Sequence, residues 1–176
     1  MSNKYACAFS GHRPKSFPWK HDETSPDCLL LKEILAREIE ELVTRGVTQF
    51  YTGLAEGVDT WAAQIVLDLR DKKPALNVHC ILPCRTQAKN WSTAAQICYQ
   101  KVLERADSIT YLSEEYYDGC MLDRNRYLVD HSDILLAIYN GSWRSGTGMT
   151  VRYAKKLGRE VIIIDPKTRT VTRTEE

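Results

Sequence analysis

The sequence has no Cys-x-x-Cys pair, although it contains six cysteines, at positions 7, 28, 80, 84, 98 and 120. Zinc sites and small disulfide frameworks need paired or regularly spaced cysteines, so the sequence favours neither. Several of the six lie within apolar segments, where a reduced thiol behaves as a small apolar side chain. We therefore predict no metal site and no disulfide framework.

The sequence also has little net charge, at +1 with a pI near 7.6. A protein that holds nucleic acid or a membrane surface through a broad electrostatic field needs a larger basic excess. No apolar run is long enough to span a bilayer, and the first eight residues carry no signal-peptide core. We therefore expect a cytoplasmic protein with no membrane partner, for which nucleic acid is an alternative partner but not the favoured one.

Two familiar phosphate-binding patterns are missing, the Walker sequence G-x-x-x-x-G-K-[ST] and the dinucleotide fingerprint G-x-G-x-x-G. An ATP or NAD bound in the usual manner is therefore not expected, and no cofactor is predicted. Internal repeats, linkers and low-complexity segments are absent from the sequence too. We predict a single domain over residues 1–176 with its core at about 5–165.

Short apolar segments alternate with longer segments of helical periodicity along the whole chain. The apolar segments resemble parallel strands that are buried on both faces. This pattern predicts a doubly wound, mainly parallel α/β sheet of the Rossmann-like type. If the first strand is central, the strand order is 4-3-2-1-5-6, and residues 166–176 form a tail or an added edge strand. The expected strands are residues 5–10, 49–52, 77–82, 108–112, 134–139 and 161–164.

The stretch Thr52–Ala63 follows an expected strand and opens an expected helix. Gly53 and Gly57 allow a sharp turn or a close approach to a ligand. The helix start behind them presents unpaired N–H groups and the positive end of a dipole, with Asp59 as the expected N-cap. This stretch alone fits a plain strand-to-helix turn equally well.

Two further glycine-bearing turns follow expected strands, at residues 10–13 and 141–148. The carboxyl ends of parallel strands share one edge, and ligands bind there beside the point where the winding reverses. We therefore expect the three turns to meet between the first and fifth strands and to hold a phosphate, with Arg13 or Arg144 adding charge. The expected ligand-binding residues of these turns are Ser10, Gly11, His12, Arg13, Gly53, Glu56, Gly57, Asp59, Gly141, Ser145, Gly146, Thr147 and Gly148.

Other polar and aromatic residues allow two interpretations each. Arg124 and Asn125 either form a solvated first turn of a helix or lie at the same carboxyl edge, and we count them among the ligand-binding candidates. His12 has the chemistry of a general base, although a loop histidine is more often a hydrogen-bonding residue. Trp91 and Trp143 flank the candidate loops and suit either base stacking or packing.

With these residues laid out, the chain resembles the SLOG superfamily, which includes the DprA and LOG families. Residues 52–63 (TGLAEGVDTWAA) are similar to the DprA pattern SGLARGIDAAAH, and residues 144–154 (RSGTGMTVRYA) to RSGSLITARLA. Residues 124–126 (RNR) are similar to the start of RNRIIAGLS, and residues 10–13 (SGHR) to the GSR turn of the group. The opening SGHRP looks most like the YpsA-like branch, a family of bacterial and phage proteins. The resemblance implies a nucleotide-type ligand and a homodimer.

The chain departs from two members of this group. LOG enzymes cleave nucleoside monophosphates with the acid of P-G-G-x-G-T-x-x-E, whereas residues 145–152 contain no carboxylate. Glu56 and Asp59 are the weak catalytic candidates that remain. The DprA family binds single-stranded DNA through a basic surface and extra domains that this near-neutral chain lacks. A nucleotide-binding or sensing protein is therefore our first hypothesis, with an N-glycosidic hydrolase and a DprA-like DNA binder as alternatives.

Overall fold

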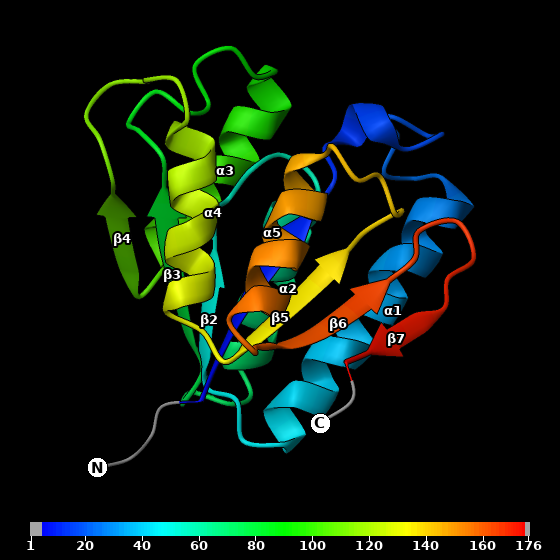
Figure 1. Cartoon of the computed structure of the whole chain (residues 1–176). Helices are drawn as coiled ribbons and strands as arrows, with labels where there is room; N and C mark the ends of the chain where they lie inside the picture. Colours follow the sequence, from blue (N-terminus) through cyan, green and yellow to red (C-terminus); the bar gives the residue numbers. More distant parts are fainter. Residues whose placement is uncertain (1–4, 175–176) are drawn as a thin grey trace.

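The computed structural model describes residues 5–174, which fold around one seven-stranded sheet (Figure 1). Its order is β4-β3-β2-β1-β5-β6-β7, and all neighbouring strands are parallel except the last pair. The predicted fold class and the order of the first six strands are confirmed, and the C-terminal segment adds an antiparallel edge strand. The strands are β1 (Ala6–Gly11), β2 (Gln49–Thr52), β3 (Asn77–Leu82), β4 (Ser108–Tyr111), β5 (Ile134–Ile138), β6 (Glu160–Ile164) and β7 (Val171–Arg173).

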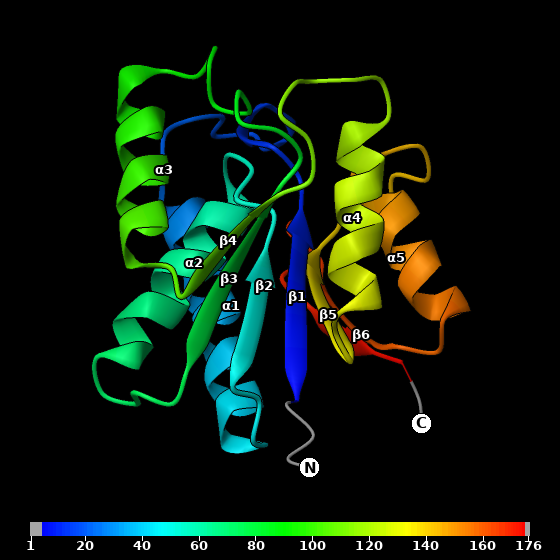
Figure 2. The same cartoon turned by 90° about the vertical axis from the view of Figure 1, so that its left-hand side faces the viewer.

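Helices cover both faces of the sheet (Figure 2). One face carries α1 (Pro26–Thr44), α2 (Val58–Arg70) and α3 (Thr93–Arg105), and the other carries α4 (Cys120–Asp130) and α5 (Gly146–Lys156). A short 3-10 helix, η1 (Pro14–Ser16), follows β1. This layering explains why the central strands are apolar on both sides, since each side is covered by helices.

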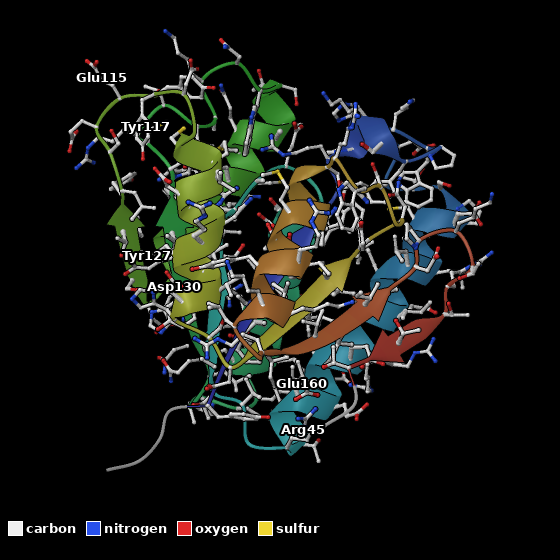
Figure 3. All side chains as sticks on the ribbon, in the orientation of Figure 1. Arg45, Glu115, Tyr117, Tyr127, Asp130 and Glu160 are labelled. Carbon is white, nitrogen blue, oxygen red and sulfur yellow. The ribbon has the colours of Figure 1, made fainter. Side chains whose placement is uncertain are left out.

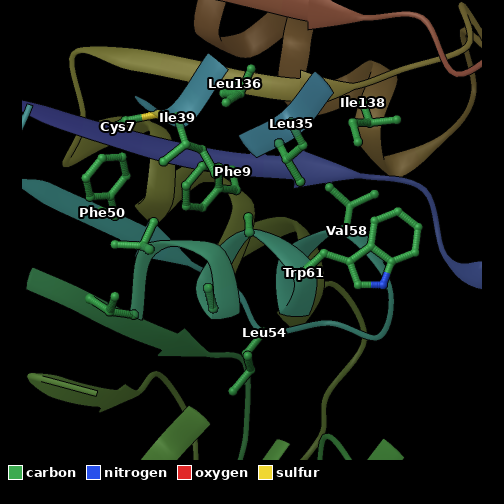
Figure 4. Close-up of a cluster of buried hydrophobic side chains, with 14 of the residues drawn as sticks. Cys7, Phe9, Leu35, Ile39, Phe50, Leu54, Val58, Trp61, Leu136 and Ile138 are labelled. Atoms are coloured by element: carbon green, nitrogen blue, oxygen red, sulfur yellow. The ribbon is translucent and has the colours of Figure 1, made fainter. Parts of the chain in front are cut away.

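Alternate residues of β1 enter two separate cores. Cys7 and Phe9 belong to the larger core beside α1 and α2, where the Phe9 and Phe50 rings stack with centroids 5.8 Å apart (Figure 4). Ala8 belongs to the smaller core beneath α4 and α5. The edge strand β4 departs from the expectation of strands buried on both faces, because its Ser108 is exposed.

Helix α2 begins at Val58, two residues earlier than an N-cap at Asp59 would place its start. Gly57 is the N-cap, and Asp59 lies inside the first turn, so the prediction that Asp59 caps this helix was wrong. The φ of Gly57 is +96°, a value that favours glycine, and a Cβ there would lie 3.2 Å from the carbonyl oxygen of His12. The turns after β1 and β2 therefore pack closely at this N-cap, and glycine suits both the contact and the backbone conformation.

None of the helices within residues 5–174 combines the length and the apolar character that crossing a membrane requires.

Candidate functional site

A cleft of about 560 Å³ opens at the carboxyl edge of the sheet, where the chain reverses its winding between β1 and β5. The register places Gly11 beside Ile138, so both strands end at the same level. The walls come from four segments that lie far apart in the sequence: the turn after β1, the turn after β2, the first turns of α4, and the start of α5. This is the place where open α/β sheets bind ligands, and the volume lies in the range of about 300–1,000 Å³ that is typical of small-molecule sites.

Eleven of the fifteen residues predicted from the sequence line this cleft, so the three glycine-bearing turns meet as expected. A ligand-binding role for them stays a prediction. Those eleven are Ser10, Gly11, His12, Arg13, Glu56, Asp59, Arg124, Asn125, Ser145, Gly146 and Thr147.

The other four predicted residues, all glycines, do not line the cleft. Gly53 packs beneath the Arg124 guanidinium, and Gly148 would bring a Cβ to 2.6 Å from the carbonyl oxygen of Ser142. Gly57 caps α2, and Gly141 adopts a φ of +88° in the loop after β5. Their common role is to let protein segments approach or turn, which is the alternative use of glycine in such loops.

The start of α5 presents its backbone to the cleft. Ser145 is the N-cap, and its Oγ accepts the N–H of Gly148 at 3.0 Å while donating to the carbonyl oxygen of Ser142 at 2.7 Å. The N–H groups of Gly146 and Thr147 precede the one that is capped, and the first N–H groups of a helix have no partner inside it. This helix end is therefore suited to an anion.

Arg124 is buried, with 3% of its surface exposed. Its Nη1 donates to the Gly53 carbonyl oxygen at 2.7 Å and to Gln87 Oε1 at 3.2 Å, and its Nε donates to Asn125 Oδ1 at 2.9 Å. The bond to Gly53 fastens α4 to the turn after β2, and the bond to Gln87 fastens it to the loop after β3. Burial lowers the pKa of the Arg124 guanidinium, and the charge of Asp59 opposes that shift.

Asp59 also lines the cleft from a buried position, with 6% of its surface exposed. Its Oδ2 accepts the N–H of Ala55 at 3.1 Å. Burial raises the pKa of the Asp59 carboxyl, while Arg124 and the Ala55 N–H oppose the rise. Asp59 and Arg124 thus both line the cleft from buried positions, and the charge of each opposes the pKa shift that burial causes in the other.

His12 joins the loops after β1 and β5. Its Nε2 accepts the N–H of Asn140 at 3.1 Å, which requires the neutral ring with its proton on Nδ1. Burial lowers the pKa of His12 and favours the same neutral form. The hydrogen-bonding interpretation of this histidine therefore has geometric support.

Sequence reasoning missed several residues of the cleft, most importantly Lys15, His21 and Met121. Lys15 lies in η1, and His21 lies in the polar loop that follows it, where Nδ1 is 3.7 Å from Glu56 Oε1. A loop has no periodicity from which the direction of its side chains can be predicted. The position of Lys15 two residues after Arg13, a predicted site residue, was a signal that it could belong to the same site. Arg144, expected as an alternative to Arg13, is exposed and does not line the cleft.

The two candidate tryptophans lie outside the cleft. Trp91 packs edge-on against Tyr99 with ring centroids 5.3 Å apart and lines a neighbouring groove. Trp143 is 69% exposed, and the Arg152 guanidinium lies 3.8 Å from its ring centroid.

The sheet order, the helices on both faces and the cleft at the reversal point define a doubly wound α/β protein of the Rossmann-like class. Within that class, residues 7–168 match the model of the YpsA family, described as the YspA SLOG family. The chain belongs to this family, as the resemblance of its motifs predicted.

Similar curated proteins come from Bacillus and related bacteria. An uncharacterized SPbeta prophage-derived protein of Bacillus subtilis, YoqJ, is 34% identical over 157 residues, covering 81% of this chain and 91% of its own. A UPF0398 protein of Halalkalibacterium halodurans is 30% identical over 128 residues, which cover 72% of this chain and 68% of that protein.

Solved structures share the fold at lower identity. DNA processing protein A from Helicobacter pylori, described with a single-stranded DNA binding mode, superposes with a TM-score of 0.61 at 19% identity. The match covers 92% of this chain but only 66% of that one. The structure of a protein named TM1055 superposes with a TM-score of 0.55 at 18% identity, and the match covers 89% of this chain and 72% of that one. Both likenesses concern the fold alone.

Proposed function

We propose that this protein binds or senses a nucleotide or a nucleotide derivative, with the phosphate held at the carboxyl edge of the sheet. One observation carries the proposal: a cleft of about 560 Å³ that brings Arg13, Lys15 and the start of α5 to the point where the sheet reverses. Arginine and lysine side chains and a helix N-terminus are the donors that phosphate groups prefer in proteins.

The acidic groups in the same cleft fit the rest of such a ligand. Glu56 is partly exposed, with 24% of its side chain accessible, and a carboxylate accepts hydrogen bonds from ribose hydroxyls or from a base amino group. Asp59 and Arg124 stabilise the floor beneath it. Ser10, Ser145 and Thr147 add hydroxyls to the wall that faces the phosphate.

Gly146 offers a sharp test of the proposed phosphate site. A Cβ on this residue meets no atom within 4 Å, so substitutions there should leave the fold intact. Gly146→Asp places a negative charge on the wall, and an acidic residue in a first turn does not weaken a helix. Calorimetry against a panel of nucleotides that includes ADP-ribose should give binding for the wild type and Gly146→Ala, and at least about tenfold weaker binding for Gly146→Asp, a difference of about 1.4 kcal/mol. If wild type and both variants bind every member equally poorly, the proposal fails.

A second candidate function is N-glycosidic hydrolysis, and the two carboxylates on the cleft wall favour it. A general acid and a partner carboxylate need different environments, and Glu56 is partly exposed whereas Asp59 is buried. Chromatography after incubation with nucleoside monophosphates and NAD tests this function. Release of a free base by the wild type but not by Glu56→Gln would support it, and unchanged substrate at high protein concentration would support binding alone.

A third candidate is single-stranded DNA binding, because the Helicobacter pylori neighbour is described with that activity. The near-neutral charge of this chain gives it little electrostatic support. A mobility shift that weakens steeply with salt would favour it over a small ligand.

The remaining expectations are also proposals. We propose a single domain over residues 1–176, a homodimer and a cytoplasmic location, without a cofactor or a metal. Limited proteolysis, sedimentation velocity and cell fractionation test the domain, the dimer and the location in turn.

A further inference from the structure

A second hollow adjoins the cleft. This groove has a volume of about 530 Å³ and lies between residues 20–23, helix α2 and the start of α3. Pro14, His21 and Glu56 line both hollows, so the two share a boundary. Two adjoining hollows, each in the size range of about 300–1,000 Å³ for a small-molecule site, suit a ligand with two parts.

The chemistry of the groove differs from that of the cleft. Its walls carry the amides of Gln64 and Asn90, the hydroxyl of Ser92 and the ring of Trp91. Amides exchange two hydrogen bonds with the edge of a base, and an aromatic ring offers a surface for stacking. Unlike the cleft, the groove contains no arginine. Its charged residues are Lys20, Glu23 and the shared Glu56, and the start of α3 forms part of its wall.

The ring of Trp91 is held in place before any ligand arrives. Its edge contact with Tyr99, at 82° between the ring planes, anchors it against a residue of the larger core. A fixed aromatic side chain loses little conformational entropy on binding, which favours recognition of a planar group.

The boundary between the two hollows is a weak barrier. His21 Nδ1 and Glu56 Oε1 are 3.7 Å apart, and 67% of the His21 side chain is exposed. A contact of this length on a mostly exposed side chain contributes little stability, so a ligand that crosses this boundary displaces the His21 side chain at small cost. The Glu56 carboxylate then lies midway between the anionic and the uncharged part of the ligand, where a ribose belongs.

From these contacts we infer that the groove is a subsite for a nucleoside and that the protein takes a two-part ligand, a nucleoside joined to a second group through a pyrophosphate. This inference rests on the proposed phosphate site in the cleft. The pyrophosphate occupies the cleft beside Arg13 and Gly146, and the base lies in the groove between Trp91 and the amides of Gln64 and Asn90.

Cys98 supplies a reporter for the groove. It lines this hollow and is partly exposed, whereas the other five cysteines of the chain are buried. The rate at which iodoacetamide alkylates Cys98 in the native protein, measured by mass spectrometry of the intact protein, therefore reports whether the groove is occupied. The variant Cys98→Ser confirms which cysteine is modified.

The probes are inorganic pyrophosphate, which we expect to fill only the cleft, and ADP-ribose, which we expect to reach both hollows. ADP-ribose should slow the alkylation of Cys98 by at least about fivefold, and saturating pyrophosphate should leave the rate unchanged.

Calorimetry gives a second measurement that does not depend on the thiol. The double variant Gln64→Ala/Asn90→Ala should bind ADP-ribose at least about tenfold more weakly, because two hydrogen bonds are lost. Its affinity for pyrophosphate should not change. The matched control is Gln100→Ala, an exposed glutamine of α3 outside the groove.

The outcomes separate this inference from the proposed function. Binding of pyrophosphate together with unprotected Cys98 and an unaffected double variant overturns the nucleoside subsite while the phosphate site stands. Failure of both probes to bind overturns the phosphate site and the subsite with it.

Discussion

The guanidinium of Arg124 lies directly against the Cα of Gly53 and donates a hydrogen bond to the carbonyl oxygen of the same residue. A Cβ on residue 53 would come within 2.6 Å of the Arg124 Nε, closer than real Cβ contacts. The glycine of the turn after β2 therefore makes room for an arginine from α4, and the cleft above it keeps a fixed floor.

The variant Gly53→Ala should unfold more easily, because Arg124 must leave its partners to make room for the methyl group. Loss of hydrogen bonds to a buried charged group costs about 2 kcal/mol. Urea unfolding monitored by circular dichroism measures the difference. Gly146→Ala is the matched control, since no atom lies within 4 Å of its Cβ position, and it should shift the free energy of unfolding by less than about 0.5 kcal/mol. Equal effects of both variants would contradict this arrangement.

Arg124 and Asp59 should be energetically coupled, because the charge of each affects the pKa of the other. Arg124→Met removes the charge that opposes the burial of the Asp59 carboxyl and leaves the Gly53 carbonyl oxygen without its donor, at a cost of about 1–3 kcal/mol. Adding Asp59→Asn to Arg124→Met should restore about 1 kcal/mol or more, a coupling that a double-mutant cycle measures. Strict additivity of the two substitutions would show that they do not interact.

A second ion pair, far from the cleft, predicts a pH dependence of stability. Arg45 donates from Nη1 and Nη2 to the two carboxylate oxygens of Glu160, at 2.9 and 2.6 Å (Figure 3). This hydrogen bonding lowers the pKa of Glu160 below its ordinary 4.5. The stability that it contributes is therefore present above pH 4.5 and is lost as the pH falls through the lowered pKa.

Glu160→Gln should thus reduce the free energy of unfolding by about 1 kcal/mol at pH 7, and the difference should close below pH 4.5. The exposed pair of Arg85 and Glu114 provides the control variant Glu114→Gln, with little effect at either pH. Urea midpoints across the pH range give the comparison. A Glu160→Gln deficit that does not shrink as the pH falls below 4.5 would rule out the ion pair as its source.

The buried ring of His12 predicts a pH dependence in a different window. Burial lowers the pKa of His12 below its ordinary 6.5, so the unfolded chain takes up the proton first as the pH falls. The contribution of His12 to the free energy of unfolding is therefore fully present above pH 6.5 and is lost as the pH falls from 6.5 through the lowered pKa. His12→Gln, which keeps a hydrogen-bond acceptor, should flatten the fall in stability between pH 7.5 and 5. His21→Gln, at an exposed loop position, should leave the fall unchanged; identical profiles for both variants would remove His12 from the explanation.

Much of the fold could be predicted from the sequence, because buried parallel strands leave a simple pattern. The apolar run of β5 and the turns that follow β1 and β2 were sufficient to place the reversal of the winding. The sequence left open whether residues 166–176 form a tail or an edge strand, since the three residues of β7 carry too little periodicity to decide it, and it gave no sign of the antiparallel pairing. The strand order follows once the first strand is taken as central, because the chain then winds outward to one edge and returns to build the other side.

The candidate site was harder to predict, for a physical reason that the glycines illustrate. A glycine permits a close approach, but the sequence does not say whether the approaching group is a ligand or the protein itself. Gly53 admits Arg124, and Gly11 admits the side chain of Val58, although Gly11 also lines the cleft. Lys15 and His21 were missed because the direction of a loop side chain depends on tertiary contacts.

The antiparallel strand β7 has a consequence for self-association. It covers the open backbone of β6, and Arg173 fastens it to Glu38 and Glu41 of α1. At the opposite border, β4 ends the sheet with its Ser108 and Ile109 exposed. An uncovered border is a template onto which a further chain can add. The other border of the intact sheet is β7, which is only three residues long. Shortening the protein before Val171 would replace it with the five-residue strand β6, and so would give a further chain a longer template on that side.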